Sequence, residues 1–132
     1  MNTPRFAAQY LESPPAGAGP AEVRRHLAEA FARLPIDALL LGWDLPPKLE
    51  ETVAGECARA GTKLYRWQPL LTGDSQTEFP PEWAVIGLDR FPVPGHGGLP
   101  EFTFACPNRP AVAEFLAERV ETVAARGLFQ GI

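Results

Sequence analysis

The chain has 132 residues, of which 45% are hydrophobic and 21% are charged, a composition typical of one folded globular domain. Its formal charge of −4, the lack of a basic cluster and the lack of a long apolar run argue against nucleic acid and membrane as partners. Two cysteines fit neither a disulfide framework nor a zinc motif, and no signal peptide is apparent, so we expect a cytoplasmic protein without a metal.

The first elements expected along the chain are a strand and a helix. Arg5–Glu12 is short, apolar and partly alternating, and the following Ser13-Pro14-Pro15 ends it, which predicts a strand. Pro20 suits the first position of a helix, and Glu22 complements the helix dipole. The apolar residues of this helix recur at helical spacing: Val23, Leu27, Ala30, Phe31 and Leu34.

The most informative stretch runs from Ile36 to Trp43. It contains an unbroken apolar run, Ala38–Gly42, whereas a strand with one wet face would alternate. The run therefore predicts a strand covered on both faces, as in a parallel sheet. It stops at Trp43 and Asp44, and ligands of parallel α/β proteins bind at the carboxyl ends of strands.

A second helix and a third strand follow. The helix opens at Pro46-Pro47 and closes at Gly61, a residue suited to a left-handed cap. Its apolar stripe consists of Leu49, Val53, Cys57 and Ala60. Lys63–Leu71 is then predicted as a strand. Helical crossovers between successive strands require the strands to be parallel.

The alternation of strands and helices stops in residues 72–109, which contain no apolar pattern long enough for a helix. Two short apolar pieces, Trp83–Leu88 and Phe102–Cys106, could pair as a hairpin. A structureless loop of this length would count against the assignment unless the loop is functional. A third helix follows, with Asn108 as a plausible cap and Pro110 in the first turn. Its apolar face consists of Val112, Phe115, Leu116, Val120, Val123 and Ala124. Leu128–Ile132 is predicted to begin a fourth strand.

These elements predict an α/β fold of parallel βα repeats that forms about half of a TIM-type barrel. Residues 1–132 are expected to be a single domain, the amino-terminal part of a (β/α)8 barrel, with residues 72–109 as the long loop between the third strand and the third helix. A small doubly wound domain is the alternative. It would carry helices on both faces of the sheet, whereas a barrel segment carries them on its outer face only.

Four segments also carry a resemblance to a known family: Ile36–Trp43, Leu64–Trp67, Phe102–Asn108 and Leu128–Ile132. Through them the chain resembles the amino-terminal half of a (β/α)8 barrel from the hypothetical glycosyl hydrolase group, which is related to the α-amylase-like clan. In such proteins Cys-Pro-Asn leads into a helix and then a strand that ends in aspartate. Here the strand reaches Ile132 without one, so the resemblance implies that the family's catalytic carboxylates are absent from this chain.

The expected strand ends also indicate a carbohydrate site. Aromatic rings stack on the apolar faces of pyranoses while polar neighbours bond the hydroxyls. Each strand end offers such a mixture: Tyr10 with Glu12, Trp43 with Asp44, and Trp67 with Gln68. Alternatively, Trp43 and Trp67 simply cap the barrel core. Arg66 and Trp67 should face opposite ways, and the pattern does not say which of them points inward.

Other candidate residues have equally plausible structural roles. His96 lies in a glycine-rich loop that could fold over a ligand, Asn108 could donate to a ligand or cap the third helix, and Asp44 could cap the second. Glycoside hydrolysis needs two carboxyl groups, but no pair is singled out. The candidate carboxylates are Glu12, Asp44, Asp74, Asp89 and Glu101.

We therefore expect the amino-terminal part of a carbohydrate-active, glycoside hydrolase-like barrel, with a carbohydrate ligand as its partner. It would contribute substrate contacts but no catalytic pair, and we expect no glycosidase activity from it alone. No glycine-rich loop has the spacing of a nucleotide site, so no cofactor is expected. The alternative is a non-enzymatic half barrel that binds carbohydrate or self-associates as a homodimer through its open sheet edges, which light scattering at several concentrations would reveal.

Overall fold

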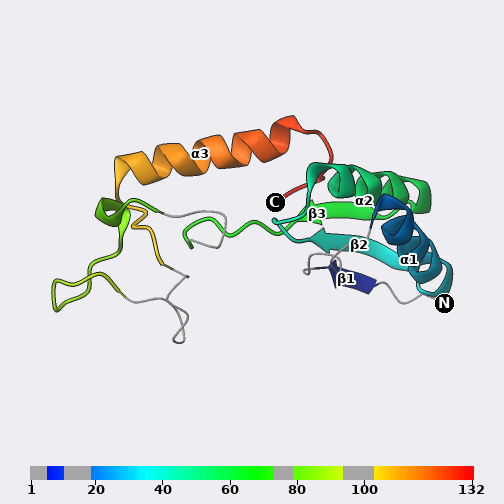
Figure 1. The fold of residues 1–132 in the computed structure, drawn as a ribbon, viewed down its shortest axis with the longest axis horizontal. Coiled ribbons are helices and arrows are strands. Elements are labelled where there is room, and N and C mark those ends of the chain that lie inside the picture. The colour runs from blue at the N-terminus through cyan, green and yellow to red at the C-terminus, as the bar shows by residue number, and fades with distance from the viewer. Residues whose placement is uncertain (1–5, 11–18, 73–78, 94–102) are drawn as a thin grey trace. The chain divides into compact units, whose positions relative to one another are not determined.

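The structure is a computed structural model that describes residues 6–10, 19–72, 79–93 and 103–132 (Figure 1). The chain divides into two compact units: residues 1–68 together with Val123–Ile132, and Pro69–Thr122. The elements in order are β1 (Phe6–Tyr10), α1 (Pro20–Arg33), β2 (Ile36–Leu41), α2 (Pro47–Ala60), β3 (Lys63–Arg66), the 3-10 helix η1 (Pro81–Trp83) and α3 (Pro110–Ala125). The predicted alternation of strands and helices up to β3 is therefore confirmed.

The first unit is built on a parallel sheet in the order β1-β2-β3. Leu39 pairs with Ala8 on one side and with Leu64 on the other. On the outer side of β3, Gly131 makes a parallel bridge with Tyr65, and the Arg66 amide donates to the Gly131 carbonyl at 2.9 Å. Residues 130–132 thus lie beside β3, where a fourth strand was predicted, but they make an isolated bridge and not a strand.

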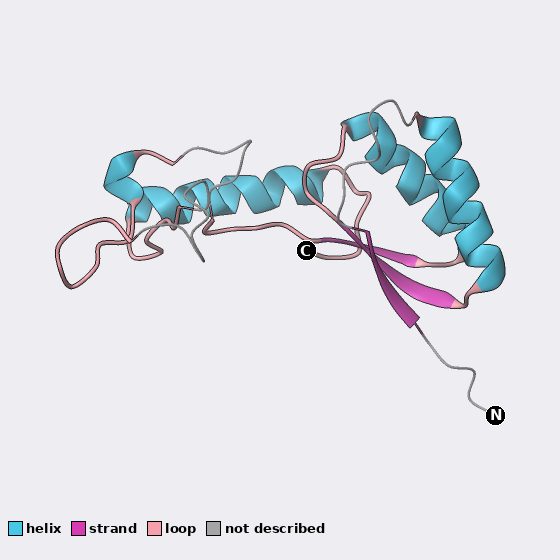
Figure 2. Ribbon diagram, turned by 60° about the horizontal axis from the view of Figure 1, so that its bottom comes forward, coloured by secondary structure: helices cyan, strands magenta, loops and turns pink. Residues whose placement is uncertain are grey.

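Both helices of the first unit cover the same face of this sheet (Figure 2). Their apolar stripes meet the inward side chains of β2 and β3 in one core, formed by Val23, Leu27, Leu39, Leu41, Leu45, Leu49, Val53, Cys57 and Leu64. A doubly wound domain would place crossover helices on both faces. Sequential parallel strands with α1 and α2 on one face are instead compatible with part of a (β/α)8 barrel.

Several predicted boundaries were wrong. β3 ends at Arg66 instead of Leu71, although the Trp67 amide still donates to the Leu41 carbonyl at 2.8 Å. Pro69 lies two residues beyond and has no amide to continue the ladder. At the start of α2 the cap position belongs to Pro46, so Asp44 does not cap this helix. Gly61 does adopt the left-handed conformation predicted for it, with φ 71°.

Cys57 is part of the core of the first unit and is 1% exposed. Burial, helped by the neighbouring Glu56 carboxylate, raises the pKa of its thiol from 9.0 to about 11. The folded chain therefore keeps a proton that the unfolded chain loses above about pH 9, so this contribution to stability is present below that pH and is lost as the pH rises towards about 11.

We accordingly expect the free energy of unfolding to fall with pH more steeply in the wild type than in Cys57→Ala between about pH 9 and 11. Urea denaturation at a series of pH values measures this slope. Cys106→Ala is the matched control and should keep the wild-type slope, because Cys106 is only partly buried. Equal slopes in the wild type and in Cys57→Ala would contradict the expectation.

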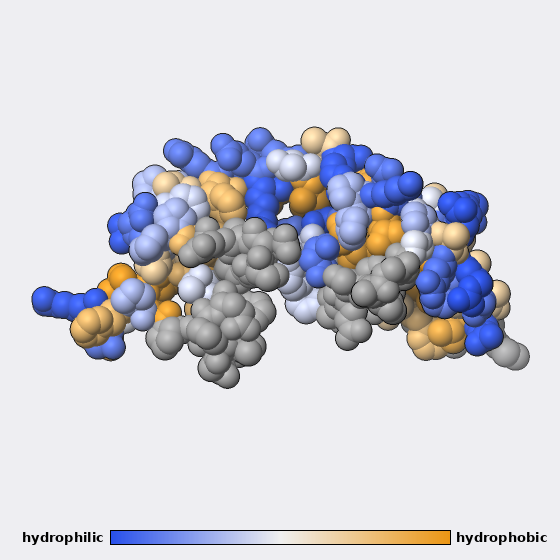
Figure 3. All heavy atoms as spheres, in the orientation of Figure 1, coloured by the Kyte–Doolittle hydropathy of each residue, from blue (hydrophilic) through white to orange (hydrophobic). Residues whose placement is uncertain are grey.

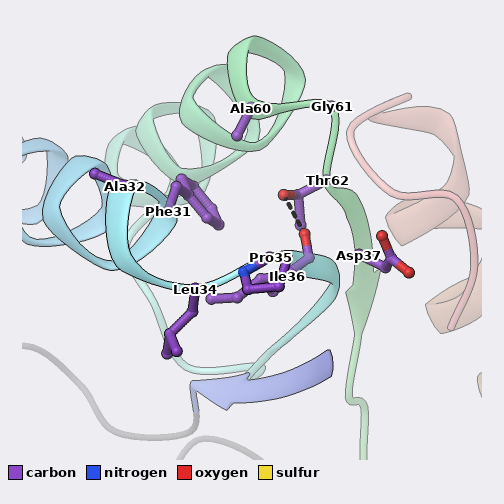
Figure 4. Close-up of a pocket in the computed structure, with 9 residues that line it drawn as sticks. All are labelled: Phe31, Ala32, Leu34, Pro35, Ile36, Asp37, Ala60, Gly61 and Thr62. Carbon is purple, nitrogen blue, oxygen red and sulfur yellow. Dashed lines mark hydrogen bonds between the residues drawn. The ribbon is translucent and has the colours of Figure 1, made fainter. Parts of the chain in front are cut away.

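A pocket of about 490 Å³ lies at the amino-terminal end of the sheet, where α1 leads into β2 and α2 leads into β3. Phe31, Leu34 and Ile36 supply apolar walls. The Thr62 hydroxyl donates to the Ile36 carbonyl at 2.8 Å and ties the two connections together (Figure 4). Residues at this end of parallel βα repeats serve stability, whereas ligands bind at the opposite end.

The second unit has its own core, in which Phe79, Ala105 and Val112 are buried against Trp83 and Phe115. Its backbone is joined by antiparallel bridges, Thr72 to Phe104 and Ala84 to Ala105. The Val85 amide donates to the Phe104 carbonyl at 2.9 Å. The two apolar pieces noted in the sequence therefore lie side by side, and their pairing is short.

A tight turn within residues 85–93 exposes apolar side chains. The Val93 amide donates to the Val85 carbonyl at 2.8 Å, and the Gly87 amide donates to the Phe91 carbonyl at 2.8 Å. The exposed members are Ile86, Leu88, Phe91 and Val93. Apolar atoms are visible at this part of the surface, at the left of Figure 3. We refer to residues 85–93 as the apolar hairpin.

α3 begins as its proline predicted, but its cap differs. The Arg109 carbonyl accepts bonds from the amides of Val112 and Ala113, so Arg109 and not Asn108 holds the cap position. Val112 and Val123 of the predicted apolar face are buried, whereas Val120 is exposed. No helix among the described residues combines the length and the apolar character needed to cross a bilayer.

Candidate functional site

Two tryptophans meet at the carboxyl end of the sheet in the first unit. Trp43 follows β2 and Trp67 follows β3. Because the strands are parallel neighbours, their ends are adjacent. The ring centroids are 6.2 Å apart with an interplanar angle of 67°, an edge-to-face pair. Trp67 is 42% exposed, while Trp43 is partly buried, so the pair presents a partly exposed aromatic surface.

The polar neighbours of the two tryptophans have different surroundings. Asp44 is exposed and interacts electrostatically with Arg66. Gln68 is buried, and its Oε1 accepts a bond from Arg66 Nε at 3.1 Å. An exposed carboxylate can accept bonds from ligand hydroxyls. Asp44 is therefore open to solvent, whereas Gln68 is held by Arg66.

A charge cluster of Glu50, Arg66 and Arg126, in which Glu50 and Arg66 are buried and Arg126 is partly exposed, contacts the Trp43 backbone. Arg66 is 9% exposed, and its Nη2 donates to the Trp43 carbonyl at 2.5 Å while its Nη1 donates to Glu50. Arg126 donates to the other oxygen of the Glu50 carboxylate. Burial lowers the pKa of Arg66, while the nearby Asp44 carboxylate opposes this shift. The cluster thus ties α2, β3 and the residue that follows α3 to the backbone of Trp43.

The structure decides which way Arg66 and Trp67 face. Arg66 lies on the helix side of the sheet, since it reaches Glu50 on α2. Alternation along the chain then directs Trp67 to the other side. The sequence interpretation missed Glu50, although Glu50, Val53 and Cys57 share the helical spacing of the buried stripe. A carboxylate at such a spacing signals a buried acid. Arg126 gave no comparable signal, because it is 76 residues away from Glu50.

The other predicted site residues are distributed as follows. Tyr10 pairs through its backbone with Leu41, beside the end of β2, and its side chain lies outside the described residues. Glu12 and His96 lie outside the described residues altogether, as do the candidate carboxylates Asp74 and Glu101. Asn108 is exposed in the turn before α3, in the second unit.

Asp89, another candidate carboxylate, lies in the turn of the apolar hairpin. Its Oδ1 accepts a bond from the Phe91 amide at 3.1 Å, a local contact that stabilises turns. Asp89 therefore has a structural partner within its own turn. Across the described parts of the chain, no group of three or more His, Cys, Asp and Glu residues is placed to hold a metal ion.

No protein-family model matches the chain, and no curated protein matches it significantly. Among solved structures, it is similar to an α-galactosidase from Thermus thermophilus in complex with p-nitrophenyl α-D-galactopyranoside, with a TM-score of 0.63 and 17% sequence identity. The similarity covers 95% of this chain and 29% of the α-galactosidase chain. At this identity the comparison concerns the fold alone. The chain has a fold like that of part of a glycoside hydrolase.

Proposed function

We propose that the chain is part of a carbohydrate-active, glycoside hydrolase-like barrel and that it supplies substrate-binding residues. The observation that carries this proposal is the Trp43–Trp67 pair at the carboxyl end of the parallel sheet. This is the end at which barrels of βα repeats bind their ligands. The fold similarity to part of an α-galactosidase supports the same class of ligand.

The chemistry of the pair suits a pyranose. One face of a pyranose consists largely of C–H groups, which pack against a flat ring, and its rim consists of hydroxyls. The exposed ring of Trp67 offers the flat surface, and Trp43 contacts that ring in an edge-to-face pair. A ring held in place loses little conformational freedom when a ligand binds. Asp44 supplies an acceptor for hydroxyls next to it.

The first strand would extend this surface. Tyr10 pairs with Leu41, so the end of β1 is adjacent to the end of β2. We propose that Tyr10 and Glu12 add a further ring and carboxylate to the sugar site. We also propose His96 and Asn108 as residues that contact carbohydrate.

The proposal is one of binding and not of turnover by this chain alone. Glycoside hydrolysis requires two carboxyl groups on either side of the scissile bond. Glu50 is buried beneath two arginines and is engaged by both of them. Asp44, next to Trp43 in the sequence, is an exposed carboxylate. We therefore assign substrate contacts to the chain and leave the catalytic pair to other parts of a complete barrel.

Removing the exposed ring tests the proposal. We expect Trp67→Ala to weaken binding of methyl α-D-galactopyranoside by about tenfold, the effect of losing roughly 1.4 kcal/mol of stacking energy. Isothermal titration calorimetry measures the dissociation constant. Phe91→Ala is the matched control, because it removes an exposed aromatic ring from the apolar hairpin, and it should bind like the wild type. Equal affinity in both variants, or no saturable binding by the wild-type chain, would rule out this sugar site.

A further inference from the structure

Arg66 joins three acceptors in the first unit. Its Nε donates to Gln68 Oε1 at 3.1 Å, its Nη2 donates to the Trp43 carbonyl at 2.5 Å, and its Nη1 donates to Glu50 Oε1. The guanidinium is planar and holds its donors in a rigid fork. Two of the three acceptors belong to Trp43 and to the residue after Trp67. Arg66 therefore connects the Trp43 backbone to Gln68, the residue that follows Trp67.

Arg66 makes more contacts than the compensation of its buried charge requires. A buried arginine must be compensated by a negative charge, which Glu50 provides. However, a buried ion pair contributes little net stability compared with apolar packing of the same volume. Besides pairing with Glu50, the Arg66 guanidinium therefore fixes the positions of the Trp43 carbonyl and the Gln68 side chain.

We propose that Arg66 is a positioning residue for the carbohydrate site: anchored on Glu50, its guanidinium fixes the Trp43 backbone and Gln68 and so sets the edge-to-face arrangement of Trp43 and Trp67. The role assigned to the ligand rests on the proposed function. The geometric part does not, because the arrangement of the two rings can be measured without any ligand.

Comparison with Arg126 distinguishes the geometric role of Arg66 from the effect of its charge on Glu50. It donates to the other oxygen of the same Glu50 carboxylate, from the position that follows α3. The contacts to the Trp43 carbonyl and to Gln68 belong to Arg66. Changing each arginine to lysine preserves the charge beside Glu50 in both cases. Only the change at Arg66 removes the fork that reaches Trp43.

The experiment compares Arg66→Lys with Arg126→Lys in a Trp83→Phe background. The chain has three tryptophans, and Trp83 lies in the second unit, so this background leaves Trp43 and Trp67 as the tryptophan signal. We expect Arg66→Lys to lose most of the near-ultraviolet circular dichroism of the pair and to bind methyl α-D-galactopyranoside about tenfold more weakly. Arg126→Lys should retain both properties, and far-ultraviolet spectra verify that the variants fold.

Equal losses in the two lysine variants would overturn the proposal, because they would indicate a general effect of the charge cluster. An unchanged near-ultraviolet spectrum in folded Arg66→Lys would overturn it as well. If Arg66→Lys does not fold, Gln68→Leu replaces it, since this variant removes one acceptor of Arg66 and should reduce the same signal. Absence of sugar binding by the wild type would refute the proposed function, while the spectra would still decide the role of Arg66.

Discussion

Replacing Glu50 by glutamine should lower the free energy of unfolding by about 3–5 kcal/mol, the usual cost of breaking a buried ion pair from one side. Glu50 is 1% exposed and accepts bonds from Arg66 and Arg126. Glutamine has nearly the same shape but no charge, so the buried Arg66 guanidinium loses its hydrogen-bonded counter-ion and retains the electrostatic interaction with the exposed Asp44. A loss of this size is a large part of the stability of an ordinary domain. Urea denaturation followed by circular dichroism measures it.

The adjacent residue offers a matched control for this prediction. Glu51 is exposed on the same helix, and surface substitutions usually change stability by no more than about 0.5 kcal/mol. Glu51→Gln should therefore unfold at the same urea concentration as the wild type. If Glu50→Gln behaved like Glu51→Gln, the charge cluster would not exist as described.

Replacing Leu41 by alanine should lower the free energy of unfolding by about 2–5 kcal/mol. Leu41 is 0% exposed and lies in register between Tyr10 and Arg66, at the carboxyl end of the central strand. Strands on both sides and helices on one face limit how far its neighbours can move, so the substitution leaves a cavity. Thermal and urea unfolding both report this loss.

Leu34→Ala is the control for the core substitution. Leu34 is 51% exposed at the end of α1, so the same chemical change there removes little buried surface. We expect it to cost less than about 1 kcal/mol. Comparable losses at Leu34 and Leu41 would mean that β2 is not the central strand of the sheet.

The sequence predicts the repeating part of this fold well. Helical spacing and proline positions locate α1, α2 and α3, and the unbroken apolar run locates β2. The end of β3 is less predictable, because apolar residues continue past Arg66 with Trp67, Leu70 and Leu71. Pro69 lies inside that run, and its missing amide explains why the ladder stops early.

Part of the candidate site was also predictable, for a topological reason. Parallel strands place their carboxyl ends together, so Trp43 and Trp67 meet as the order of elements predicts. The side of the sheet on which Arg66 lies was not predictable. Side chains alternate between the two faces of a strand, but this alternation does not tell which face the helices cover. Its partner Glu50 and the distant Arg126 are brought together only by tertiary packing.

The pairing of Gln130 with β3 has a consequence for the order of folding. Gln130 donates to the Leu64 carbonyl and accepts from the Leu64 amide, a pairing that spans 66 residues. The contacts of β1, β2 and β3 instead join neighbours in sequence through single helices. Closing the longer loop costs more chain entropy before its contacts repay it, so this last parallel pairing should form late, after β1 to β3 have assembled.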